Sequence, residues 1–147
     1  MDDTTFKLLQ WDAQGFCCSQ ILMLLALEDM GEDNPPLVRS MAGLCEGLSD
    51  RSGICGAASG AACVLALYAG KGSDQEQSLE SLPLLLSGFM EWFTENSLSW
   101  GGMRCEDIIA FHGAEHKEAC GNIILQARAR ILELLAEYDI DPTMPKE

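Results

Sequence analysis

Apolar residues recur at helical spacing along most of the chain, and no run of alternating β-branched residues predicts a strand. The pattern predicts a first helix over residues 4–14 and a second over 16–30 that stops at Gly31. A third is expected to begin at Pro35, which suits a first helical turn, and to end near Leu44. These features favour an all-α protein.

The later part of the chain continues the helical pattern after a glycine-rich loop at 43–53. The further helices predicted from it cover residues 54–70, 75–100, 104–111 and 114–138. Pro83 either kinks the long helical region or divides it into two. We therefore expect one domain over 1–147, a compact bundle of about six to seven helices, with a tail at about 139–147 that is prone to disorder.

Residues 54–70, ICGAASGAACVLALYAG, contain no charge over seventeen positions. The segment is shorter than the roughly 20 apolar residues that a membrane span needs, and its first half is Gly, Ala and Ser. It is therefore expected to be the central buried helix of the bundle. Gly56 and Gly60 stand four apart, so a neighbouring helix can approach their shared face closely.

Composition and charge narrow the classes of function that the chain can have. The chain of 147 residues has 9 basic and 23 acidic side chains and a formal charge of −14. No Lys/Arg cluster is available to neutralise phosphates, which argues against a nucleic-acid or anionic-lipid partner. Residues 1–10 are acidic and lack the features of an export signal, so a reducing cytoplasm is expected. There, thiols serve as metal ligands, catalysts or inert buried side chains rather than permanent disulfides.

Three of the seven cysteines fall at predicted helix starts, namely Cys18, Cys55 and Cys105. Backbone N–H groups and the helix dipole at such places favour a thiolate, which is the nucleophilic and metal-binding form. Cys120 lies on the apolar stripe of the last helix, where a core role is the ordinary interpretation.

The other three cysteines carry weaker signals. Cys17 points about 100° away from Cys18 on a helix, Cys63 is expected to pack in the core, and the role of Cys45 in the glycine-rich loop is open.

Four segments together resemble a known family. They are FCCSQILM (16–23), GICGAASGAA (53–62) with its CGAxxG motif, MRCEDII (103–109) and EACGNIILQARARIL (118–132). Their order and separations resemble the C-GCAxxG-C-C family, small bacterial and archaeal chains marked by four cysteines and described as redox-active. Members often lie near transporter genes.

The resemblance places the family's four cysteines at Cys18, Cys55, Cys105 and Cys120. Cys18 is chosen over Cys17 because a small residue and then Gln20 follow it. The family's glycine run before the CGA motif is interrupted here by Cys45 and Glu46. The resemblance implies that the four cysteines meet near one end of the Gly/Ala helix.

Three functions stay open at this point. The first is a redox-active thiol protein that uses the four family cysteines for thiol–disulfide or electron-transfer chemistry, as in a thiol oxidoreductase in which one cysteine attacks and another resolves. The second is a zinc or iron–sulfur module, held either by those four cysteines or by Cys105, His112, His116 and Cys120. The third is a non-catalytic partner protein. A redox partner, a transporter component and a second copy of the chain are the partners that these functions would involve.

Overall fold

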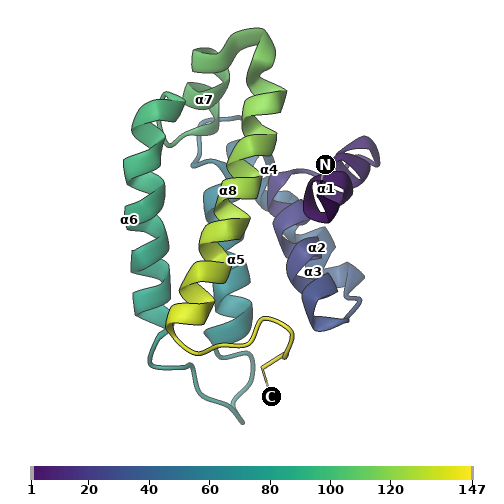
Figure 1. Cartoon of the computed structure of the whole chain (residues 1–147), viewed down its shortest axis with the longest axis vertical. Helices are drawn as coiled ribbons and strands as arrows, with labels where there is room; N and C mark the ends of the chain where they lie inside the picture. Colours follow the sequence, from purple (N-terminus) through teal and green to yellow (C-terminus); the bar gives the residue numbers. More distant parts are fainter. Residues whose placement is uncertain (1, 147) are drawn as a thin grey trace.

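Helices dominate the computed structural model, which describes residues 2–146 (Figure 1). The α-helices are α1 (Asp3–Ala13), α2 (Cys18–Met30), α3 (Pro35–Met41), α4 (Cys45–Leu48), α5 (Gly56–Ala69), α6 (Leu82–Trp100), α7 (Cys105–His112) and α8 (His116–Glu137). Two 3₁₀ turns, Ala42–Leu44 and Gly113–Glu115, complete the helical elements. Within the described residues there is no strand, only an isolated bridge between Ile54 and Arg104. The all-α prediction is confirmed.

Local sequence signals explain most helix ends. The Asp2 carboxylate accepts a hydrogen bond from the Thr5 N–H at 2.7 Å and caps α1. The Asn34 side chain caps α3 in the same way, and Gly31 ends α2 in the left-handed conformation. The predicted helix over 75–100 is wrong in its first part. It begins at Leu82, because Pro83 fits only the first turn of a helix.

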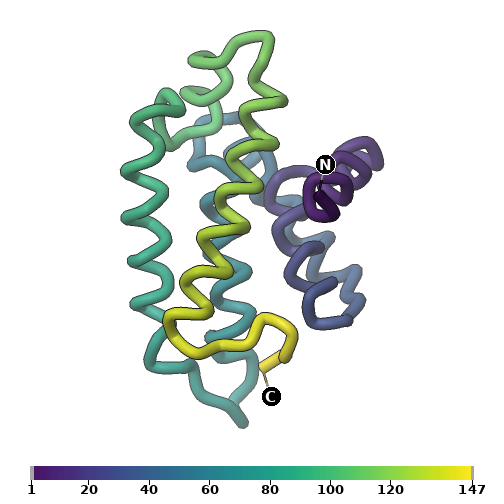
Figure 2. The backbone as a smooth tube through the Cα atoms, in the orientation of Figure 1, coloured from purple at the N-terminus to yellow at the C-terminus, as the bar shows by residue number. Residues whose placement is uncertain are grey.

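The Gly/Ala helix α5 lies in the middle of the molecule, as predicted. It packs against α2, α6 and α8, which surround it in Figure 2. Ala61, Leu65 and Ala69 on this helix are fully buried. None of the helices in residues 2–146 combines the length and the hydropathy that a transmembrane span requires.

The small residues of α5 have the role that their spacing predicts. A Cβ at Gly60 would lie 2.8 Å from Ser19 Cα, and a Cβ at Gly56 would overlap Cys18 Sγ. The neighbour that approaches this face is therefore the first turn of α2. Close packing here brings the Cys18 side chain directly against the start of α5.

Residues 138–146, which follow α8, lie at the opposite end of α5 from α7 (Figure 1). The Tyr68 hydroxyl donates a hydrogen bond to the Pro142 carbonyl at 2.8 Å, and the Lys146 ammonium donates to the Gly70 carbonyl at 2.6 Å. These contacts connect the segment after α8 to the C-terminal half of α5.

Candidate functional site

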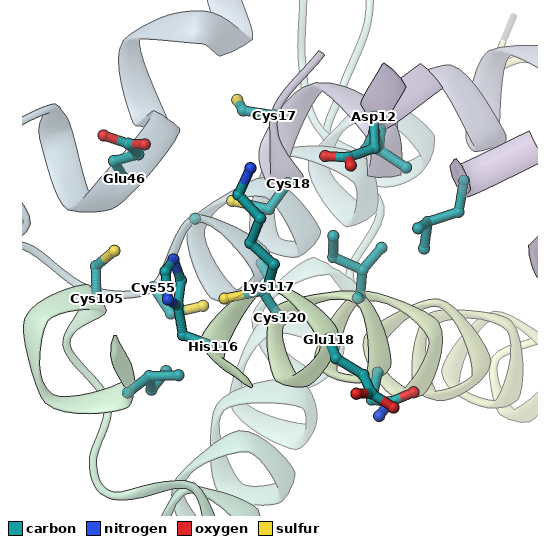
Figure 3. A pocket seen from close by; sticks show the side chains of 18 of the residues that line it. Asp12, Cys17, Cys18, Glu46, Cys55, Cys105, His116, Lys117, Glu118 and Cys120 are labelled. Atoms are coloured by element: carbon teal, nitrogen blue, oxygen red, sulfur yellow. The ribbon is translucent and has the colours of Figure 1, made fainter. Parts of the chain in front are cut away.

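A cavity of about 450 Å³ opens where the first turns of α2, α5, α7 and α8 meet. All four family cysteines line it: Cys18, Cys55, Cys105 and Cys120 (Figure 3). Its walls are largely apolar, with Leu side chains from α1 and Ile side chains from α2, α7 and α8. The fold thus brings together four cysteines that are spread over about a hundred residues of sequence.

Cys18 and Cys55 face each other across the contact between α2 and α5. Cys18 is the first residue of α2, and Cys55 is the N-cap residue of α5. Because Gly56 has no side chain, the Cys18 sulfur can occupy the space beside the α5 backbone. The CGAxxG motif therefore has a packing function as well as supplying a cysteine.

Backbone pairing places Cys105 beside the start of α5. The Cys55 N–H donates to the Met103 carbonyl at 2.8 Å, and the Cys105 N–H donates to the Gly53 carbonyl at 3.1 Å. A Cβ at Gly47 would lie 2.9 Å from Cys105 Cβ and 2.6 Å from the Gly53 carbonyl oxygen. Glycine at position 47 is thus required for the loops to meet.

Cys120 enters the pocket from α8, one turn after His116 and Lys117. Figure 3 shows the sulfur atoms of Cys55 and Cys120 directed towards one another, and a charge on Cys120 raises the pKa of Cys55. The apolar stripe that carries Cys120 does face the core, but this cysteine lies where the stripe reaches the cavity.

Burial decides the ionisation of the two inner cysteines. It raises the pKa of Cys18 to about 11 and that of Cys55 to about 12, with a further contribution from neighbouring cysteines. The sequence predicts that backbone N–H groups at a helix start favour the thiolate, and the backbone hydrogen bonds at both cysteines do act in that direction. The N–H groups of Ala57 and Ala58 do lower the pKa of Cys55, but burial outweighs them. Both side chains are therefore thiols at neutral pH.

Cys105 and Cys120 are less deeply buried than the inner pair. Burial still raises the pKa of both thiols. At Cys105 the Arg51 guanidinium acts in the opposite direction and favours the thiolate, while Glu46 and Glu106 oppose it. Among the four, Cys105 is the least enclosed and the only one with a cationic side chain that lowers its pKa.

A left-handed turn borders the cavity, in place of the loop predicted at 43–53. Glu46, Leu48 and Ser49 have positive φ values of 51°, 64° and 74°, and Gly47 lies between them with φ 59°. Such conformations are strained for residues with side chains and are found preferentially at functional sites. The turn directs the Glu46 N–H towards Cys18, where it favours the thiolate against the larger effect of burial.

The structure contains one feature that the sequence analysis missed, a disulfide between Cys17 and Cys45. Cys17 also lines the cavity, next to Cys18. The buried Ser19 hydroxyl lies 3.3 Å from Cys17 Sγ and 3.6 Å from Cys45 Sγ. The two cysteines are 28 positions apart, and no motif in the sequence indicates that they pair.

The two histidines lie in different places. His116 lines the cavity, whereas the His112 ring packs against its own helix, with Nδ1 2.9 Å from the Ile108 carbonyl oxygen. Within residues 2–146 no group of three or more Cys, His, Asp or Glu side chains is arranged to hold a metal ion. The four-residue set Cys105, His112, His116 and Cys120 is therefore not assembled as a ligand set.

Cys63 lies outside the cavity. It is half-buried on α5 and packs against the hydrophobic core, in agreement with the packing role predicted for it. It provides a natural reference for the cysteines of the site.

Comparisons with known proteins give one family. The model of a family described as "Putative redox-active protein (C_GCAxxG_C_C)" matches residues 16–134. Neither the curated proteins nor the solved structures contain a match.

Proposed function

The chain belongs to the C_GCAxxG_C_C family, and we propose that it is a thiol–disulfide oxidoreductase whose reacting pair is Cys55 and Cys120. The observation that carries the proposal is the convergence of the four family cysteines on one cavity, with Cys55 and Cys120 directed towards each other. A disulfide needs Cβ atoms about 4 Å apart and accessible sulfur. The two sulfurs line the same cavity, which opens to solvent on the side of Cys120.

The chemistry consists of two exchange steps. The Cys120 thiolate attacks one sulfur of a substrate disulfide and releases the first substrate thiol. The Cys55 thiolate then attacks Cys120 Sγ and releases the second thiol. The protons of Cys120 and Cys55 end on the two substrate thiols, and the protein holds a Cys55–Cys120 disulfide. In reverse, the same pair oxidises a substrate dithiol.

How deeply each of the two sulfurs is buried determines its role in the exchange. Of the reacting pair, Cys120 is less deeply buried than Cys55, so it is the one of the two that a substrate disulfide meets first. The high pKa of Cys55 keeps it protonated until a mixed disulfide forms beside it. The apolar walls and the volume of about 450 Å³ suit a small disulfide or the exposed disulfide loop of a partner protein.

The test is disulfide mapping after oxidation. Reduced protein is incubated without oxygen with hydroxyethyl disulfide, quenched in acid, alkylated with N-ethylmaleimide and analysed by peptide mass spectrometry. We expect a Cys55–Cys120 peptide that dithiothreitol removes. Cys55→Ser should instead accumulate a mixed disulfide on Cys120. Cys63→Ser is the matched control and should behave like the wild type.

The proposal fails if Cys55 and Cys120 remain alkylatable while the same reagent oxidises a control peptide thiol. It also fails if the Cys55–Cys120 disulfide forms but dithiothreitol does not reverse it in the folded protein.

A further inference from the structure

We infer that the Cys17–Cys45 disulfide is a second redox centre, which exchanges oxidising equivalents with the family cysteines through Cys18. The inference rests on the proposed thiol chemistry and extends it to two cysteines outside the family's set of four. Three independent features of the structure support it: the position of Cys17, the surroundings of Cys18 and the conformation of the turn after Cys45.

The first feature is the position of Cys17. Cys17 lines the same cavity as Cys18 and Cys55, so the disulfide is part of the wall of the site. The core provides a large apolar cluster around α5 without it.

Cys18 is surrounded by the segment that carries Cys45. A Cβ built on Gly56 would overlap Cys18 Sγ and lie 3.1 Å from the Leu44 carbonyl oxygen, so Cys18 and Leu44 both flank the start of α5. On the other side of Cys45, the Glu46 N–H favours the Cys18 thiolate. Cys18 therefore lies beside the segment that carries Cys45, on the wall of the cavity that Cys17 also lines.

The environment of the disulfide suits a leaving thiolate. The Ser19 hydroxyl, fully buried, lies beside both sulfur atoms and at present donates to the Met41 carbonyl at 2.8 Å. Rotation of this hydroxyl can supply a hydrogen bond to a thiolate released at Cys17. The strained turn at Glu46–Ser49 directly follows Cys45, so the backbone there is held in a conformation that bond exchange can relax.

The exchange balances without an outside oxidant. The Cys18 thiolate attacks Cys45 Sγ, the Cys17–Cys45 bond breaks, and Cys17 leaves as a thiolate that takes up a proton. The Cys55 thiolate then attacks Cys18 Sγ and releases Cys45, which is protonated in turn. One disulfide, Cys17–Cys45, is replaced by another, Cys18–Cys55, and two protons move from Cys18 and Cys55 to Cys17 and Cys45.

The experiment approaches the same state from two directions. One sample, oxidised to the two-disulfide state with Cys17–Cys45 and Cys55–Cys120, receives one equivalent of dithiothreitol per chain. One sample of fully reduced protein receives one equivalent of diamide, so that each sample ends with one disulfide per chain. Both are kept without oxygen, and the disulfides are mapped over time by acid quench, alkylation and mass spectrometry. In the wild type we expect both samples to reach the same ratio of Cys17–Cys45 to family-cysteine disulfides, independently of protein concentration.

Variants isolate the role of Cys18. Cys18→Ser and Cys18→Ala should slow the approach to this common ratio at least tenfold, whereas Cys63→Ser should leave it unchanged. In Cys17→Ser, one equivalent of diamide should form a Cys18–Cys45 disulfide, which is the intermediate of the exchange. This variant keeps the inference testable if changes at the tightly packed Cys18 prevent folding.

Two results would overturn the inference. One is a wild type whose two samples keep different disulfide ratios, and the other is a Cys18 variant that converges as fast as the wild type. Neither touches the proposed function, because the Cys17→Ala, Cys45→Ala double variant should still form Cys55–Cys120 with hydroxyethyl disulfide. Loss of that disulfide in the wild type would instead contradict the proposed function itself.

Discussion

At the scale of single residues, depth in the fold controls the chemistry of the cysteines. All four family sulfurs have raised pKa values, and burial is the largest cause at each. The helix starts still favour the thiolates of Cys18 and Cys55, but only as a smaller, opposing effect. Burial therefore favours the thiol form of all four side chains over the thiolate.

The raised pKa values predict alkaline destabilisation. The native state binds the protons of Cys18 and Cys55 more tightly than the unfolded chain, where thiols titrate near 9.0. The stabilisation from these two groups is complete below pH 9 and is lost as the pH rises towards 11 to 12. Urea unfolding between pH 8 and 11 should show this decline, and Cys55→Ala should flatten it. An equal slope in both proteins would contradict the prediction.

Arg51 should make Cys105 the most reactive of the four thiols. Its guanidinium lowers the pKa of Cys105 against burial, and this side chain is also the least enclosed. Iodoacetamide at pH 7.5 should label Cys105 first, and Arg51→Gln should move the pH profile of that labelling upwards. Arg104→Gln, an exposed arginine near the same helix start, is the matched control. An unchanged profile in Arg51→Gln would exclude the proposed electrostatic effect.

At the scale of elements, the site depends on how closely α2 approaches α5. Gly56 and Gly60 remove the side chains that would hold the two helices apart, and the first turn of α2 fills the space. The left-handed turn after Cys45 then borders the cavity. Two backbone hydrogen bonds complete it: the Gly53 carbonyl accepts from the first residue of α7, and the Met103 carbonyl accepts from the N-cap residue of α5. Each cysteine is thus positioned by backbone packing.

Gly56→Ala tests this packing. The new methyl group would overlap Cys18 Sγ and approach the Leu44 carbonyl, so the free energy of unfolding should fall by about 1–3 kcal/mol. The accessibility of Cys18 to alkylation should change as well. Gly121→Ala is the control, because its Cβ would meet only Leu8 at 3.9 Å and alanine is the better helix former. Denaturant unfolding should show no loss for Gly121→Ala.

At the scale of the whole molecule, the Cys17–Cys45 disulfide joins the start of α2 to the turn that leads into α5. It closes a loop with a sequence separation of 28. The bond lies at the end of the bundle that holds the cavity, far from the contacts of Tyr68 and Lys146 at the other end (Figure 1). Changes in its oxidation state should therefore act on the site first.

Reduction should lower the stability of the whole domain. A loop of this length is stabilised by about 3.5 kcal/mol when a disulfide closes it. Denaturant unfolding with and without a phosphine reductant should show a difference of this order. The Cys17→Ala, Cys45→Ala double variant should not respond to the reductant. A response in the double variant equal to that of the wild type would assign the effect to another disulfide.

At this scale, the binding partners of the protein stay a prediction. The charge of −14 and the absence of a basic cluster are sequence properties that favour partners other than nucleic acid. Association with a redox partner or a transporter component, and residence in the cytoplasm, are expectations from the sequence and the family. A pull-down with the Cys55→Ser variant tests the redox partner, because this variant should retain a mixed disulfide with it.

The sequence by itself determined the helical class, the central place of the Gly/Ala helix and the face on which Gly56 and Gly60 admit a neighbour. These features follow from local periodicity and side-chain size. It also indicated that Cys18, Cys55 and Cys105 stand at helix starts, because glycines and caps mark such ends locally. The motif order then pointed to the family that the comparison identifies.

Only the tertiary structure decided how these cysteines behave. The pairing of Cys17 with Cys45, the left-handed turn beside them and the separation of His112 from the cavity all depend on contacts between distant segments. The direction of the pKa shifts reversed for the same reason. A helix start favours a thiolate through nearby N–H groups, but desolvation depends on every element packed around the sulfur, and only the folded chain determines that packing.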